Sequence, residues 1–449
     1  MDPQRAKSAQ LEALHEALHS GAMHQERGLV HALHPAEIAD FLESLPPPQR
    51  VIVWELVDKK DEGEVLVALN DEVRAMLLQK MDSEQLVAAV AGLDLDDLAD
   101  LFTELPETVN LEVLKSLNQS DRLRLKAALS YDEDSAGGLM DPDTLTVRSN
   151  VTIEVVLRYL RMRGEIPKDT DAIFVVSRKG KYQGSLFIAA MLTADLKQEV
   201  SSLIDTQSRA IEANTTATEV ALIFETQDLI SAAVVDQTGR LLGRITIDDV
   251  VDVIRHQADH SVLSMAGLDE DDDMFAPVFV SARRRSIWLG VNLATAFIAA
   301  GVANLFETTL EQVVMLAILM PVVPSMGGIA GSQTLILITR GIALGQVESS
   351  NARWLLSKEF GVGLLNGLAW ASIVAGITMW WFQTWKIALV IAIALAVNLV
   401  CAAVAGFTIP LMLKKLKIDP ALAGGVVLTT ITDVVGLTAF LGFGTLLLL

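Results

Sequence analysis

One carboxylate lies deep in an uncharged segment in the last part of the sequence. Asp433 ends the sequence LTTITD and is the only charged residue between Pro420 and Leu449. A charged side chain within a membrane-length apolar segment is costly, and such residues commonly bind ions or relay protons. Because no Lys or Arg lies at a comparable depth in any apolar segment, we expect a metal cation or a proton to supply the counter-charge. The alternative is a protonated or hydrogen-bonded Asp433 that only links helices.

The residue types near Asp433 favour a hard cation. Mg²⁺ prefers oxygen ligands, keeps several waters and takes one or two carboxylates. A soft metal is disfavoured, because Cys401 is the only cysteine and no histidine follows His260. Glu359 begins another apolar segment, where it could line a pore mouth or simply be a solvated carboxylate at a helix start. Asn398 and Asn292 are the kind of residue that forms hydrogen bonds between membrane helices.

A second apolar segment is interrupted by helix-breaking residues. The sequence MPVVPSMGGIAGSQT (320–334) contains two prolines and three glycines. Broken backbone is tolerated at membrane depth only where it is buried in protein or lines a water-filled cavity. We therefore predict a break here, with Ser332 and Gln333 facing the cavity. The alternative is a packing kink with small residues at a helix crossing.

Five apolar stretches are long enough to span a bilayer, which needs roughly 20 residues each. They cover 286–306, 312–339, 360–385, 387–413 and 420–449. Most Lys and Arg residues of this half lie before the first span and in alternate loops, so the positive-inside rule places the N-terminal half in the cytoplasm and the C-terminus outside. Five spans without internal duplication do not readily enclose a path, and a symmetric homodimer would supply ten.

The charge of the chain is divided between two halves. The chain has 449 residues and a net charge of −21, yet 51% of its residues are hydrophobic. The part after residue 280 carries a balance of +4, and the part before it carries −25. An acidic soluble half repels phosphate, so we expect no nucleic-acid partner. The single cysteine excludes a disulfide scaffold, and the first ten residues have no apolar core, so we expect no cleavable signal peptide.

The acidic half contains two internal repeats. The segment 37–57 is repeated loosely at 97–117, as in stacked helical repeats. A pattern of strand, glycine turn, strand and helix occurs at 173–192 and again at 231–250, and it resembles a tandem pair of CBS domains. In such domains the motif around Thr246 and Asp249 often contacts a nucleotide ribose. An adenine nucleotide such as ATP is thus a possible ligand, and a helix N-cap is the alternative.

Carboxylates recur at helical spacing in this half. Asp96 and Asp100 lie four residues apart, and Asp249 and Asp252 lie three apart. Adjacent like charges destabilise a fold unless solvent or cations compensate them. A solvated acidic face is the usual interpretation, but beside a cation channel these pairs predict a cation sensor. The run DEDDD at 269–273 is interpreted as a solvated linker.

These segments in this order resemble the MgtE family of magnesium transporters. The motifs that carry the resemblance are YDEDSAGGLMDP, GRLLGRITIDDVVDV, KEFGVGLLNGL and ITDVVGL. The resemblance implies a homodimer in the lipid bilayer of the cytoplasmic membrane, selective for Mg²⁺ and closed by its cytosolic domains when internal Mg²⁺ is high. It implies pore residues at Asp433, Glu359, Gln333, Asn398 and Thr429. It implies regulatory Mg²⁺ ligands at Asp96, Asp100, Asp228, Asp248, Asp249 and Asp252.

The expected architecture is multidomain, with an all-α superhelical N domain, α/β tandem CBS domains and an α-helical membrane domain. The boundaries are an acidic helical N domain (1–130), a first CBS domain (131–202), a second CBS domain (203–256), a connecting plug-like helix with its linker (257–282) and five transmembrane helices (283–449).

The sequence departs from the family pattern in the membrane half and in the connecting helix. Ile329 and Gly425 stand where the family has asparagine, and the connecting helix carries little of the usual acid. A carrier of another divalent cation such as Mn²⁺ or Co²⁺, a Na⁺- or H⁺-coupled carrier, and a metal-sensing membrane regulator without flux therefore remain alternatives. We do not expect an enzyme, because the sequence shows no nucleophile–base pair, phosphate loop or histidine cluster.

Overall fold

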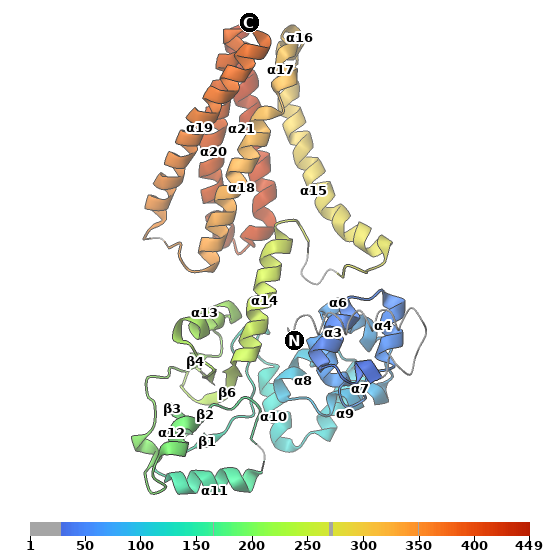
Figure 1. Cartoon of the computed structure of the whole chain (residues 1–449), viewed down its shortest axis with the longest axis vertical. Coiled ribbons are helices and arrows are strands. Elements are labelled where there is room, and N and C mark those ends of the chain that lie inside the picture. Colours follow the sequence, from blue (N-terminus) through green and yellow to red (C-terminus); the bar gives the residue numbers. More distant parts are fainter. Residues whose placement is uncertain (1–27, 165, 269–272, 349) are drawn as a thin grey trace. The chain divides into compact units, whose positions relative to one another are not determined.

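The computed structural model describes residues 28–164, 166–268, 273–348 and 350–449, and Figure 1 shows the elements they form. The chain folds as two compact units. The first contains the described residues up to Ala258 together with 273–276, and the second contains Asp259 to 268 together with Pro277–Leu449. The expectations for residues 1–27, including the absence of a signal peptide, lie outside the described residues.

The N domain is a succession of short helices. They are α3 (Pro35–Glu43), α4 (Pro47–Trp54), α5 (Glu62–Ala68), α6 (Asp71–Leu78), α7 (Ser83–Val90), α8 (Leu95–Phe102), α9 (Glu107–Ser116) and α10 (Gln119–Ala128). Polar N-caps start several of them, since the side chains of Asn70 and Asp82 accept hydrogen bonds from the first turns of α6 and α7. Each helix buries an apolar stripe, with Phe41 and Leu101 wholly inside. The predicted helical domain is confirmed.

Two small sheets follow, and they have the same topology. The first consists of β1 (Thr146–Val147), β2 (Ala172–Val176) and β3 (Tyr182–Phe187), with α11 (Ile153–Arg163), α12 (Ile188–Thr193) and η1 (Val200–Ser202). The second consists of β4 (Ile211–Glu212), β5 (Ser231–Val235) and β6 (Leu241–Thr246), with α13 (Ala217–Gln227) and α14 (Ile247–Ser264). In each sheet the first pair is parallel and the second is an antiparallel hairpin. The predicted repeat of strand, turn, strand and helix is confirmed.

The N domain and the second sheet share one hydrophobic core. Leu101 of α8 belongs to the same buried cluster as Phe224 of α13 and Val250 of α14. The first sheet has a separate core that contains Ile173 and Leu186. The N domain is therefore packed directly against the second repeat of the pair, and this packing brings their acids together.

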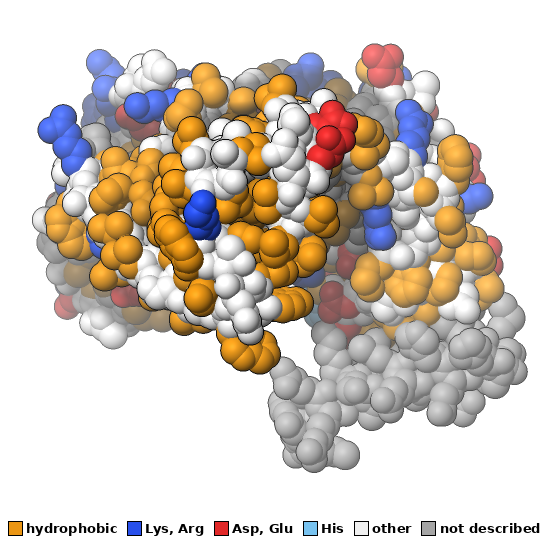
Figure 2. Space-filling view, turned by 90° about the horizontal axis from the view of Figure 1, so that it is seen from above, with side chains coloured by type: hydrophobic (Ala, Val, Ile, Leu, Met, Phe, Trp, Pro, Cys, Tyr) orange, Lys and Arg blue, Asp and Glu red, His pale blue; other side chains and the backbone are white. Residues whose placement is uncertain are grey.

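The second unit contains five helices long and apolar enough to cross a membrane, as predicted. Its helices are α15 (Val278–Asn304), α16 (Glu307–Gln312), α17 (Val314–Leu319), α18 (Val322–Ala343), α19 (Ala352–Phe382), α20 (Trp385–Lys415) and α21 (Pro420–Leu448). Figure 2 looks onto the end where α16 and the C-terminus lie in Figure 1, and it shows hydrophobic side chains over most of this face. α20 is the most buried span and packs against α18, α19 and α21.

The second span is broken, but at one point only. α17 ends at Leu319 and α18 begins at Val322, so the chain leaves the helix at Met320 and Pro321. The glycines that follow are helical, contrary to the expectation that they would interrupt the segment. Pro324 lies in the first turn of α18, where an N–H group would have no partner in the helix.

The predicted connecting helix is the end of another helix. α14 runs without interruption from the second CBS-like repeat to Ser264, so residues 257–264 continue it. Gly267 ends this region with a φ of +71°, and a Cβ atom there would lie 2.9 Å from the indole ring of Trp288. Glycine is required by both the backbone conformation and the space. The predicted domain boundaries themselves stay predictions.

Candidate functional site: membrane carboxylates and a cytosolic acidic cluster

Asp433 lies on a face of α21 that one chain leaves partly open. Its side chain is half-buried, and Thr429, one turn earlier on the same face, is exposed. The Thr429 hydroxyl donates to the carbonyl of Gly425 at 2.9 Å, which leaves its oxygen able to accept or ligate. Among the residues that the structure describes, none forms a hydrogen bond or ion pair with the Asp433 carboxylate. A metal cation or a proton, the two counter-charges expected from the sequence, would compensate this carboxylate.

Gln333 lies on an open face of α18. Its side chain is exposed, and Ile329, one turn earlier, is 58% exposed. The opposite face of α18 is buried, and there Gly331 packs against Leu428 of α21. The small residues of this segment thus serve helix packing, as the alternative interpretation held, whereas Gln333 points away from that contact. The structure does not test whether Gln333 contacts an ion.

Glu359 is not a solvated carboxylate at a helix start. Its exposed fraction is 4%, and it accepts a hydrogen bond from the Thr334 hydroxyl of α18 at 3.2 Å. Lys358 Nζ lies 3.4 Å from its other oxygen. The solvated alternative is therefore wrong, since Glu359 links α19 to α18 and is charge-compensated by its neighbour. Its pore role remains a prediction.

Asn398 lies at a three-helix crossing. It is completely buried, and its Nδ2 atom donates to the carbonyl of Val323 at 2.8 Å. Cβ atoms added at Gly327 of α18 and Gly436 of α21 would lie 2.2 Å and 2.8 Å from Nδ2. This arrangement favours the interhelical hydrogen bond over a pore position. Asn292 is exposed and donates to the Trp288 carbonyl of its own helix at 2.9 Å, so it joins no other helix through this bond.

An acidic cluster forms where α8 of the N domain meets the second CBS-like repeat. Burial is the largest cause of the raised pKa of three carboxyl groups in this cluster. The pKa is about 7 for Asp96 and Asp100 and about 8 for Asp249. Asp96 interacts electrostatically with both Asp249 and Asp141, and one of its oxygens is buried without a hydrogen-bond partner among the described residues. Asp97, with a pKa raised to about 7, lies beside it. The structure thus brings Asp96 of the N domain and Asp249 of the second repeat together, and their role as Mg²⁺ ligands stays a prediction.

The cluster is open to a hydrated cation but is not a closed metal shell. In the described ranges, no three carboxylate, histidine or cysteine side chains converge as a metal-binding group. Mg²⁺ commonly keeps several waters and uses one or two carboxylates. The orphaned oxygen of Asp96 and the mutual repulsion with Asp249 fit such an ion. Two carboxylates with these raised pKa values would bind it and release protons.

The other predicted regulatory acids lie at the surface. Asp228 is exposed at the C-cap of α13 in the left-handed conformation, with a φ of 51°. Asp248 is exposed in the first turn of α14, and Asp252 is exposed one turn later. Partial burial is the largest cause of a raised pKa at Asp252, and the charges of His256 and Arg255 oppose it. The structure does not bring Asp228 into the cluster, and its ligand role stays a prediction.

Asp141 was missed by the sequence reasoning. It is 7% exposed, and Arg244 of β6 binds it through Nε at 3.1 Å. The same guanidinium donates to the carbonyl of Lys168 at 2.9 Å and to the Thr170 hydroxyl at 3.2 Å, in the loop before β2. Arg244 thus joins both repeats to the segment that leaves the N domain. The sequence signal for Asp141 is the motif GLMDP (138–142), which is also part of the family resemblance.

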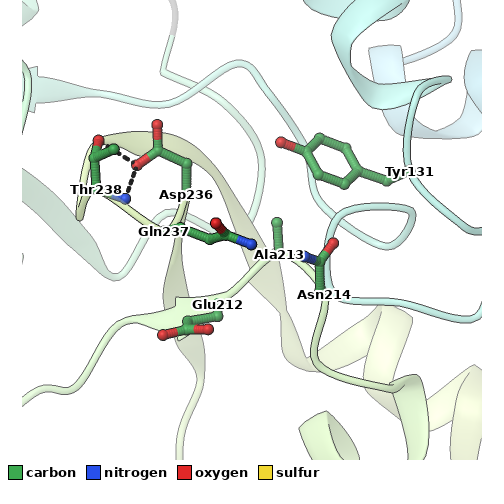
Figure 3. Close-up of a pocket in the computed structure, with 7 residues that line it drawn as sticks. All are labelled: Tyr131, Glu212, Ala213, Asn214, Asp236, Gln237 and Thr238. Atoms are coloured by element: carbon green, nitrogen blue, oxygen red, sulfur yellow. Dashed lines mark hydrogen bonds between the residues drawn. The ribbon is translucent and has the colours of Figure 1, made fainter.

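The nucleotide prediction involves residues that are already paired. The Thr246 hydroxyl donates to Asp249 Oδ2 at 3.2 Å, and its backbone N–H lies 3.3 Å from the same oxygen. Asp249, three residues into the helix, thus accepts from the residue before its first turn, which is one half of a capping box and agrees with the helix-start alternative. A pocket of about 300 Å³ lies elsewhere, lined by Tyr131, residues 212–214 and the hairpin turn 236–238 (Figure 3). None of the predicted site residues lines it.

The end of α14 reaches the beginning of α21. His260 Nε2 lies 2.9 Å from Asp419 Oδ2, and Asp419 caps the first turn of α21 by accepting from the Ala421 N–H. The buried Ser264 hydroxyl lies 3.4 Å from the His260 ring. The connecting segment of α14 has few carboxylates that could bind a bridging cation. A direct hydrogen bond from His260 to Asp419 joins it to α21 instead.

Comparisons with known proteins agree with this architecture. Family models match residues 33–134 as the MgtE intracellular N domain, 200–256 as a CBS domain and 320–443 as MgtE, a divalent cation transporter. The magnesium transporter MgtE of Thermus thermophilus is 31% identical over 97% of this chain and 98% of its own length, and that of Bacillus subtilis is 26% identical over 95% of each. A crystal structure of the cytosolic domain of the Mg²⁺ channel MgtE in complex with ATP is 31% identical, covers 54% of this chain and 99% of its own, and has a TM-score of 0.49. The chain belongs to the MgtE family of divalent cation transporters.

Proposed function

We propose that this protein is a channel-like Mg²⁺ transporter of the cytoplasmic membrane, with its N domain in the cytoplasm. The observation that carries the proposal is Asp433, a membrane carboxylate on a partly open face of α21. An ionised carboxylate at this depth requires a counter-charge. The names of the relatives specify Mg²⁺, and a carboxylate with the Thr429 hydroxyl one turn away suits a hydrated form of that ion.

Cytosolic Mg²⁺ regulates the transporter in this proposal. Asp96 and Asp249 come from different domains, and they repel each other when both are ionised. An ion between them removes the repulsion, so that Mg²⁺ stabilises the packing of the N domain against the second CBS-like repeat. α14 carries Asp249 at one end and His260 at the other. Loss of the ion would free this helix at its cytosolic end.

A homodimer completes the proposed path. Gln333, Thr429 and Asp433 face away from the packed centre of one chain, so a second copy would supply the opposite wall. The cytosolic unit also exposes apolar residues at helical spacing. On α14 they are Ile247, Val251 and Ile254. A self-complementary interface between two copies would cover such a stripe.

An adenine nucleotide at the CBS pair is a separate part of the proposal, supported by the ATP complex of the cytosolic domain named above. Thr246 and Asp249 are the residues predicted to contact it. Because the two side chains already hydrogen-bond to each other, a nucleotide would have to compete for Asp249 with the regulatory ion.

The test is divalent cation flux into liposomes that contain the purified protein. Wild type is compared with Asp433→Asn, which removes the charge but keeps the size, and with Asn292→Ala as a control in another span. Mg²⁺, Mn²⁺, Co²⁺ and Ca²⁺ are offered separately, with and without millimolar Mg²⁺ and ATP on the cytosolic face. We expect Mg²⁺ flux in wild type and in the control, suppression by cytosolic Mg²⁺, and loss of flux in Asp433→Asn.

Each other outcome identifies a different error. Unchanged flux in a folded Asp433→Asn protein would remove Asp433 from the path. Flux that prefers Mn²⁺ or Co²⁺ would make Ile329 and Gly425 the residues to revert to asparagine. No heavy atom lies within 4 Å of a Cβ atom added at Gly425, so a side chain can begin there without a clash. Flux only with a Na⁺ or H⁺ gradient would indicate a coupled carrier, and no flux at all would indicate a sensor.

A further inference from the structure

The end of the acidic linker is buried in the N domain. Asp273 was expected to be solvated, and this is wrong, because its side chain is 5% exposed and pairs with Arg50 of α4, whose side chain is 1% exposed. The pair is bidentate, with Arg50 Nη1 at 2.5 Å from one carboxylate oxygen and Nη2 at 2.7 Å from the other. The expectation for the acids at 269–272 lies outside the described residues.

The N domain is built to hold this carboxylate. Arg50 is fixed by hydrogen bonds from its Nε and Nη2 atoms to the carbonyls of Leu42 and Glu43, at 2.9 Å and 3.3 Å. Burial alone would raise the pKa of Asp273, but the hydrogen bonds from Arg50 and the Phe275 N–H hold it below its ordinary value. A bidentate Arg–carboxylate pair fixes position and direction together, which a single contact does not.

Two further contacts attach neighbouring parts of the linker to the N domain. The backbone N–H of Asp273 donates to Glu72 of α6 at 2.9 Å, and the Arg50 guanidinium lies over the ring of Phe275 at 5.9 Å. Residues 273–276 accordingly belong to the cytosolic unit, although they follow α14 in the chain. The linker is thus attached to the N domain at both a side chain and the backbone.

We propose that Arg50 and Asp273 form a latch through which the N domain acts directly on the first membrane helix. α15 begins at Val278, five residues after Asp273. Five residues reach at most about 18 Å when fully extended. A movement of the N domain larger than the remaining extension of this segment must therefore displace the start of α15. This is a second route from the N domain to the membrane unit, separate from the one through α14. As a route for gating it rests on the proposed function.

The alternative is that the pair only stabilises the N domain. Buried ion pairs are often no more stabilising than apolar residues of the same size. What the pair provides is a fixed position for a segment that would otherwise be free. The latch hypothesis therefore predicts effects in α15 and in inhibition by Mg²⁺, which a merely structural pair does not.

The experiment uses the full chain and compares wild type with Asp273→Asn and Asp273→Glu. Asp259→Asn, which changes an exposed carboxylate of α14, is the matched control. Hydrogen exchange of residues 273–282 is measured with and without Mg²⁺, alongside liposome flux. In Asp273→Asn we expect exchange of 273–276 to accelerate by about tenfold or more, because removing one partner of a buried pair leaves the other charge uncompensated. We also expect the cytosolic Mg²⁺ concentration for half-inhibition to rise several-fold, with Asp273→Glu intermediate.

The outcomes separate the latch from the proposed function. Fast exchange of 273–276 in wild type would overturn the latch, as would an unchanged half-inhibition in Asp273→Asn after the protection is lost. If wild type shows no Mg²⁺ flux, the proposed function fails and the latch is judged by exchange alone. Faster exchange of the first turn of α15 in Asp273→Asn, but not in Asp259→Asn, then supports it. Unchanged exchange there overturns it.

Discussion

Replacing Gly327 by alanine should destabilise the membrane unit through a single contact. The added Cβ atom would lie 2.2 Å from Asn398 Nδ2 and 2.8 Å from its Cγ atom. Asn398 cannot move away easily, because it is completely buried and Gly436 approaches it from α21. Either the helices separate or Asn398 turns and loses its hydrogen bond to the Val323 carbonyl.

The size of the effect follows from these two penalties. Overpacking a closely packed site costs roughly 1–3 kcal/mol, and a lost hydrogen bond between membrane helices costs about 1 kcal/mol. The sum of about 2–4 kcal/mol corresponds to a fall in Tm of roughly 5–15 °C for a unit of this size. Gly328→Ala is the matched control, since nothing lies within 4 Å of its Cβ position.

Thermal unfolding in detergent measures both variants and a double variant. Asn398→Ala makes room for the new methyl group, so Gly327→Ala with Asn398→Ala should be no less stable than Asn398→Ala alone. The coupling between the two sites should exceed about 1 kcal/mol. Equal Tm values for Gly327→Ala and Gly328→Ala would refute the reasoning. Retained Mg²⁺ flux in a folded Asn398→Ala protein would confirm a packing role, and lost flux would restore the pore prediction.

The remaining predictions concern the cytosolic acids and the end of α14. The pKa values of about 7 for Asp96 and about 8 for Asp249 lie above the ordinary 3.8, so ionising these groups costs stability. In EDTA the folded protein should lose thermal stability as pH rises from 3.8 to about 8, and Mg²⁺ should restore it. Asp249→Asn should raise the Tm in EDTA and reduce the additional rise with Mg²⁺, unlike Glu225→Gln on the surface of α13. His260→Ala removes the bond to Asp419, so inhibition of flux by Mg²⁺ should weaken while Mg²⁺ still protects α8 from hydrogen exchange; an unchanged inhibition curve would contradict this.

Much of the fold could be predicted because its signals are local. Uncharged stretches of membrane length predict spans regardless of how they pack, and all five were found. The repeated strands 173–192 and 231–250 alternate with glycine turns, which is also a local signal. Local signals also made the predicted break in the second span too long, because they covered all of residues 320–334. Glycine and proline both mark where a helix can break, but the chain leaves the helix only at Met320 and Pro321, and the glycines that follow are helical.

The contacts that connect distant segments could not be predicted in this way. Asp273 belongs to a run of acids typical of a solvated linker, and its burial depends on Arg50, 223 residues earlier. An asparagine such as Asn398 can line a pore or form a hydrogen bond at a helix crossing. Its position here depends on Gly327 of α18 and Gly436 of α21, which pack against it. Asp141 lacks the helical spacing that made Asp96 and Asp100 visible. In each case the residue type was informative, but its partner was set by tertiary packing.

The two connections from the cytosolic unit lead to helices that pack against each other. α14 ends at Ser264, and its His260 bonds to Asp419 at the start of α21, while the Arg50 latch precedes α15 by a few residues. α15 packs against α21 within the membrane unit, and α21 carries Asp433. In the proposed mechanism, a movement that released either connection alone would leave α21 restrained through the other. Inhibition should therefore be lost in two steps, and the double variant His260→Ala with Asp273→Asn should require more cytosolic Mg²⁺ for closure than either single variant.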